Sequence, residues 1–152
     1  MCWKILNGFR FAARGVWRCM REEWHFRLHL VIAFYVLVLS PYFSLSCAES
    51  AVLVLTIAAV LVAELFNSAV ERAIDRVSTE LHPLSGAAKD MAAGAVLVAA
   101  LAAVVVAILL FWKPAVWLGI FADWCQHVYK PAGLAVSAVG AVLFVWKWRV
   151  KL

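Results

Sequence analysis

Charged residues are scarce in this sequence, and the scarcity excludes most soluble folds. Of the 152 residues, 15% are charged and 66% are hydrophobic. A soluble domain of this length needs far less apolar sequence, so the composition indicates an integral membrane protein. The sequence also has no G-x-x-x-x-G-K-[ST] loop, which excludes a P-loop nucleotide site.

The four cysteines show no C-x-x-C pair and no metal-ligand spacing, and we interpret them as ordinary thiols. The basic N-terminus is not followed by the apolar core and small-residue cleavage site of a signal peptide. We find no internal repeat and no low-complexity tract, and we therefore expect one membrane domain.

Long apolar runs are the most prominent feature that is present. A spanning helix needs about 20 mostly apolar residues. Three segments approach this length, Leu28–Phe43, Ala51–Val70 and Met91–Trp112, and a shorter fourth covers Ala132–Trp146. The fourth could be a span, a re-entrant element or an interfacial helix. We predict a short fourth span, packed outside the other three.

Residues 3–26 alternate between apolar and basic positions at the helical period, which predicts an amphipathic helix in the membrane interface, closed by Glu22 and Glu23. The predicted fold is therefore all-α and integral to the membrane, with a surface helix, three core spans and a probable short fourth. The corresponding parts are 1–27 (interfacial helix), 28–112 (three-span core) and 113–152 (C-terminal extension). In the extension, residues 113–131 are predicted to be an outer connection with an aromatic belt.

Twelve of the fourteen Lys and Arg residues lie before the first span, around the second connection or after the fourth span. Only Lys113 and Lys130 fall on the other side. The positive-inside rule therefore places both termini and the 72–90 connection in the cytoplasm. We interpret the basic residues as contacts with anionic lipid headgroups and expect no nucleic acid partner.

The second span carries a polar stripe formed by Glu64, Asn67, Glu71 and Asp75. Their spacings of 3, 4 and 4 place them within about 80° of one another on one helix face. A carboxylate deep in a membrane costs about 2.5–3.5 kcal/mol on insertion scales and is normally functional. Glu64 is therefore a candidate for proton transfer, while a structural stripe that joins helices through hydrogen bonds is the alternative.

A second polar group follows in the connection to the third span. Ser85 is a predicted N-cap, and Lys89 and Asp90 would then stand in the first turn of the next helix. A helix N-terminus with a lysine can bind phosphate, and carboxylates together with phosphates suggest Mg²⁺. The residues alone indicate phosphate or metal chemistry at the membrane boundary.

The stretches AELFNSAVERAIDR and ELHPLSGAAKDMAAGAVL resemble the signature of the prokaryotic diacylglycerol kinase / undecaprenol kinase family. The segment EEWHFRLHL is similar to the family's E…FR segment, and the resemblance covers roughly residues 8–112. It implies a homotrimeric membrane enzyme, with sites between subunits, that transfers the γ-phosphate of MgATP to a lipid alcohol.

The resemblance also implies residue roles. Glu64 would be the general base, Glu71 and Glu23 would bind Mg²⁺ and ATP, and Lys89 would contact the γ-phosphate. Asn67 and Asp75 would support the site. The remaining implied ATP contacts are Asp90, the segment Glu80, Leu81 and His82, and, by a looser match near the N-terminus, Lys4 and Phe11.

The sequence leaves the acceptor lipid open between diacylglycerol and undecaprenol. Ala92 and Ala93 follow the Lys-Asp-x motif, as in many undecaprenol-type members, where diacylglycerol-specific members often carry Gly-Ser. Two other classes also fit some features. A small proton-coupled exporter would explain Glu64 and the length, and a haem-binding membrane anchor would use the histidines, but neither explains Glu71 or HPLSGAAKD.

Overall fold

The protein is a bundle of helices, as seen in a computed structural model that describes residues 2–77 and 83–147. All regular elements in these ranges are helical: α1 (Cys2–Glu22), α2 (Trp24–Leu39), the 3₁₀ helix η1 (Ser40–Phe43), α3 (Cys47–Val77), α4 (Pro83–Phe111), α5 (Pro114–Gln126) and α6 (Tyr129–Lys147). The all-α prediction is confirmed.

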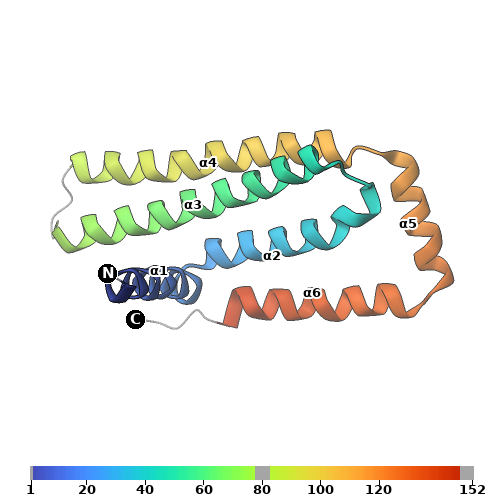
Figure 1. Ribbon diagram of the computed structural model, residues 1–152, viewed down its shortest axis with the longest axis horizontal. Helices are drawn as coiled ribbons and strands as arrows, with labels where there is room; N and C mark the ends of the chain where they lie inside the picture. The colour runs from blue at the N-terminus through green and yellow to red at the C-terminus, as the bar shows by residue number, and fades with distance from the viewer. Residues whose placement is uncertain (1, 78–82, 148–152) are drawn as a thin grey trace.

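Four helical stretches are long and apolar enough to cross a membrane: Trp24–Phe43, Cys47–Arg76, Leu84–Phe111 and Tyr129–Trp146. They run along the length of the bundle, with α1 across one end and α5 across the other (Figure 1). Each begins or ends beyond the predicted apolar segment, because hydropathy marks the hydrocarbon-facing part of a helix while hydrogen bonding carries the helix on into the polar boundary.

One local prediction, the start of the helix after the second connection, is wrong. Helix α4 begins at Pro83, so Ser85 lies inside its first turn and Lys89 stands in the second turn. Proline suits a first turn because its φ is already helical and its missing N–H has no partner there. The connection 113–131 contains α5, which Pro114 opens in the same way.

The helices pack in the order α4, α3, α2 and α6 (Figure 1). The α3 start is fixed by a capping box, in which Ser46 N–H donates to Glu49 Oε2 (2.7 Å) and Glu49 N–H donates to Ser46 Oγ (3.2 Å). Most large apolar side chains on the spans are exposed, as suits contact with acyl chains or other membrane helices.

The chain turns from α1 into α2 at Glu23, whose backbone is extended (φ −104°, ψ 116°). This turn lies at the end of the bundle where α3 ends and α4 begins. We call it the basic end, because the parts of α1, α3 and α4 that lie there carry Arg18, Arg21, Arg72, Arg76 and Lys89. Arg27 is 1% exposed and holds the turn together.

Arg27 joins three helices. Its Nη1 donates to Met20 O (3.1 Å) and Arg21 O (2.9 Å) of α1, while Nε (3.2 Å) and Nη2 (3.0 Å) donate to Val145 O of α6. The last four carbonyls of a helix have no partner within that helix, and all three acceptors belong to such last turns. One guanidinium therefore caps two helix C-termini, where a cation also suits the helix dipole.

Candidate active site

The polar stripe on α3 runs from the interior of the bundle to the basic end. Glu64 is 4% exposed, Asn67 and Glu71 are half-buried, and Asp75 is exposed. Since a helix rises 1.5 Å per residue, Glu64 lies about 10 Å deeper than Glu71. The stripe therefore places one carboxylate in apolar surroundings and leaves the others near the polar boundary.

Three helices meet around Glu64. His29 of α2 places Nε2 3.3 Å from Glu64 Oε1. One turn along α3, the buried Ser68 places Oγ 3.4 Å from Sγ of Cys19 in α1. Burial raises the pKa of the Cys19 thiol, so the thiol stays neutral and acts as a weak hydrogen-bonding group. The surface helix is thus packed directly against the stripe.

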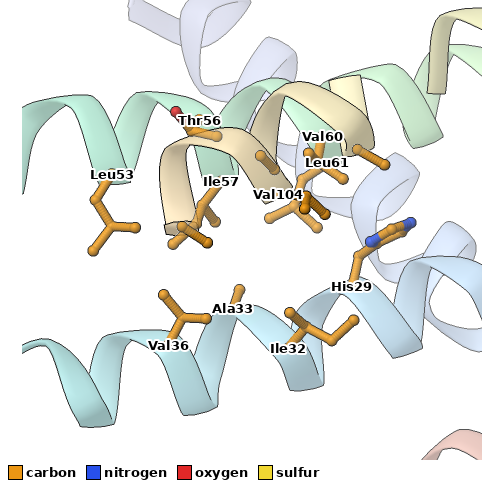
Figure 2. Close-up of a pocket in the computed structure, with 13 residues that line it drawn as sticks. His29, Ile32, Ala33, Val36, Leu53, Thr56, Ile57, Val60, Leu61 and Val104 are labelled. Carbon is orange, nitrogen blue, oxygen red and sulfur yellow. The ribbon is translucent and has the colours of Figure 1, made fainter. Parts of the chain in front are cut away.

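An apolar pocket opens beside this cluster. It lies between α2, α3 and α4, has a volume of about 210 Å³, and is lined by apolar side chains together with His29 and Thr56. Figure 2 shows His29 at one end of the pocket, with Ile32, Ala33 and Val36 following along α2. The Thr56 hydroxyl donates to Val52 O (2.8 Å), so it is occupied within its own helix. His29, next to Glu64, is therefore the polar end of an otherwise hydrocarbon-like pocket.

The predicted metal ligand Glu23 has a cationic partner. Arg72 Nη2 lies 2.9 Å from Glu23 Oε1 and 2.8 Å from Glu22 Oε2, joining the start of α2 to α3. Arg72 is one residue after Glu71, so the pairing brings Glu23 to the same end of α3 as the other predicted ligand. Spacing along the sequence does not reveal this pairing, because Glu23 and Arg72 are 49 positions apart.

Glu71 is bonded along its own helix. Asn67 Nδ2 donates to Glu71 Oε1 (3.0 Å), whereas Asn67 Oδ1 is buried and has no hydrogen-bond partner. Within the described ranges, no three His, Cys, Asp or Glu side chains form a ready metal cluster. Mg²⁺ usually takes only one or two carboxylates and completes its shell with water and phosphate oxygens. The carboxylates of Glu23 and Glu71 and the unpaired amide oxygen of Asn67 are oxygen ligands of the kind that Mg²⁺ binds.

Lys89 and Asp75 form an ion pair between α4 and α3 at the basic end. Asp90 is exposed on α4, and Phe11 is exposed on α1, where the Arg14 guanidinium lies 5.9 Å from its ring centroid. Lys4 belongs to α1, but its side chain is outside the described part. Glu80, Leu81 and His82 also lie outside the described residues, so their predicted ATP contacts stay predictions.

Sequence reasoning missed His29 and Arg72 as members of this cluster. Helical spacing can group residues on one helix, as it did for the stripe, but it does not show which face of α2 meets α3. The available signal for His29 was a single polar residue inside an apolar run, next to the start of the first span.

A bundle of spanning helices with a buried carboxylate beside an apolar pocket and a charged rim is the arrangement of a membrane enzyme that acts on a lipid. The chain belongs to the prokaryotic diacylglycerol kinase family: the family model described as "Prokaryotic diacylglycerol kinase" matches residues 10–111. The protein is accordingly a lipid kinase. The match ends at the C-terminus of α4, so α5 and α6 lie outside it.

Curated relatives support the same family. The chain is 36% identical over 108 residues to an undecaprenol kinase of Bacillus subtilis (71% of this chain, 88% of the relative). It is 33% identical over 106 residues to a diacylglycerol kinase of Escherichia coli K12 (67% and 87%). It is 40% identical over 103 residues to a diacylglycerol kinase of Synechocystis (67% and 59%).

Proposed function

We propose that this protein transfers the γ-phosphate of ATP to the hydroxyl of a membrane lipid alcohol, either undecaprenol or diacylglycerol. The observation that carries the proposal is the position of Glu64, a buried carboxylate beside the polar end of an apolar pocket. A lipid hydroxyl can reach such a base while its hydrocarbon stays in the pocket. The basic end would face the cytoplasm, where ATP is found.

Each residue of the stripe has a role suited to its depth. Glu64 removes the proton from the lipid hydroxyl, and phosphoryl transfer then depends mainly on positioning and charge stabilisation. Glu71 and Glu23 would hold Mg²⁺, with Asn67 orienting Glu71 through the bond to Oε1. When bound, Mg²⁺ would neutralise the negative charge of the phosphate groups during transfer.

Cationic side chains complete the proposed nucleotide site. Lys89 contacts the γ-phosphate in this proposal, and its exposed partner Asp75 holds it at the basic end until ATP binds. Arg72 pairs with Glu23, and this ion pair would open when Glu23 binds the divalent ion. Asp90, the segment 80–82, Phe11 and Lys4 are proposed as further ATP contacts, and the site is proposed to form between subunits of a homotrimer.

The pocket favours undecaprenol over diacylglycerol as the acceptor. Diacylglycerol carries two ester groups next to its hydroxyl, and buried ester carbonyls need hydrogen-bond donors. Thr56, whose hydroxyl is already bonded to Val52 O, and His29 are the polar residues among the pocket-lining side chains. A polyprenol, whose hydrocarbon begins immediately after the hydroxyl carbon, matches a pocket with a single polar end.

Purified protein supplied with [γ-³²P]ATP tests the proposal. Undecaprenol and diacylglycerol should be offered in parallel in identical micelles, with Glu64→Gln as the matched inactive control. We expect ³²P-labelled lipid that depends on Mg²⁺ and on Glu64, with faster labelling of undecaprenol. No labelling of either lipid would contradict the proposal.

A further inference from the structure

His29 and Glu64 form a contact between α2 and α3 that has no role in the proposal above. The two atoms, Nε2 and Oε1, lie 3.3 Å apart, and the side chains are 20% and 6% exposed. Polar groups removed from water this far are normally paired. Here His29 and Glu64 are polar partners of each other.

The location of the pair separates it from an ordinary interhelical contact. His29 lines the apolar pocket, and Glu64 lies next to His29 without being one of the lining residues, so a hydroxyl at this end of the pocket would be close to both side chains. Figure 2 shows the His29 imidazole rising from α2 at one end of the pocket. A carboxylate on a helix has several rotamers, and only those directed to the pocket can accept a proton there.

We propose that His29 is a positioning residue for Glu64. In this proposal, a proton on Nε2 faces Glu64 Oε1, 3.3 Å away, and holds the carboxylate toward the pocket, leaving Oε2 to accept the proton of the lipid hydroxyl. In the reaction, the acceptor oxygen forms a bond to the γ-phosphorus, the γ-phosphorus separates from the bridging oxygen of ADP, and the acceptor proton moves to Glu64. This inference rests on the proposed function.

The alternative role of the pair is structural, as a polar link between two membrane helices. The two roles predict different effects for substitutions that retain or remove the N–H group of residue 29. His29→Gln keeps an N–H close to the Nε2 position, whereas His29→Leu has similar bulk and no donor. His25 lies one turn earlier on α2 and is exposed, so His25→Leu is the matched control.

Steady-state kinetics of the three variants provide the first test. A hydrogen bond to a charged group is worth roughly 10- to 100-fold, so we expect His29→Leu to lower kcat by about that factor. KM for MgATP should be unchanged because the nucleotide binds at the basic end. His29→Gln should recover most of the rate, and His25→Leu should match the wild type.

An infrared measurement tests the pair without relying on turnover. The carboxyl band of Glu64 is identified by its loss in Glu64→Gln, and it should shift in His29→Leu but not in His25→Leu. An unshifted band would overturn the positioning role whether or not the protein phosphorylates a lipid. Equal kcat loss in His29→Leu and His29→Gln, accompanied by lowered thermal stability in both, would also overturn it and assign the pair to helix packing. Absence of lipid phosphorylation together with a shifted band would count against the proposed function alone.

Discussion

Removal of the Arg27 guanidinium should destabilise the bundle by an amount that the contacts allow us to estimate. Arg27→Met keeps the buried stem and deletes every donor. Three carbonyl groups then lose a charged partner, those of Met20 and Arg21 in α1 and of Val145 in α6. Hydrogen bonds to charged groups contribute about 1.5–3 kcal/mol each, so the upper bound is roughly 4–9 kcal/mol.

The net loss should be smaller than this sum. The three carbonyls lie at the polar boundary, where water can reach them once the guanidinium is gone, and the apolar replacement avoids burying a charge. We therefore expect the free energy of unfolding to fall by about 2–4 kcal/mol for Arg27→Met. Arg27→Lys retains the charge but lacks the planar guanidinium that donates to α1 and α6 at once. Its free energy of unfolding should fall by about half as much.

Unfolding of purified protein in mixed micelles, with an increasing mole fraction of SDS and circular dichroism as the signal, measures this difference. Arg10→Met is the control, because Arg10 is exposed on α1. If Arg27→Lys has wild-type stability, the forked geometry contributes nothing and the double-cap interpretation is wrong.

Deletion of residues 113–152 extends the test to α6. The truncated protein loses Val145 O as an acceptor but retains the described stripe, so we expect measurable kinase activity and reduced stability. Arg27→Met should cost less in the truncated protein than in the full chain, since part of the interaction is already missing. Equal costs would show that Arg27 does not couple α6 to the rest of the bundle.

Glu64→Gln should abolish lipid phosphorylation while MgATP binding largely survives, and near-normal turnover measured with ³²P would disprove its role as the base. Glu71→Ala and Glu23→Ala should each raise the Mg²⁺ concentration needed for half-maximal rate, because a hard cation loses an oxygen ligand; an unchanged titration for Glu23→Ala would show that Arg72 is its permanent partner. The buried Cys19 thiol, whose pKa burial raises, should react with a maleimide far more slowly than the exposed Cys47. In intact cells, an impermeant maleimide should label Cys47, and absence of labelling would contradict the predicted orientation.

The sequence alone was sufficient for the features that arise within one helix. Apolar runs of sufficient length predicted the spans because the bilayer core imposes a minimum helix length. The helical period placed Glu64, Asn67 and Glu71 on one face, and the Asn67–Glu71 hydrogen bond agrees with that spacing. The motif around these residues also predicted the kinase family, which the comparisons confirm.

Only the tertiary structure decided which helices contact one another and through which side chains. The order of the spans in sequence does not specify that α6 lies against α2, nor that Arg27 reaches Val145, because apolar helices can pack on many faces in lipid with similar energy. The Glu23–Arg72 and His29–Glu64 pairs likewise depend on how α2 is rotated toward α3. A buried polar group must find its partner in the folded protein, and the identity of that partner is a property of packing.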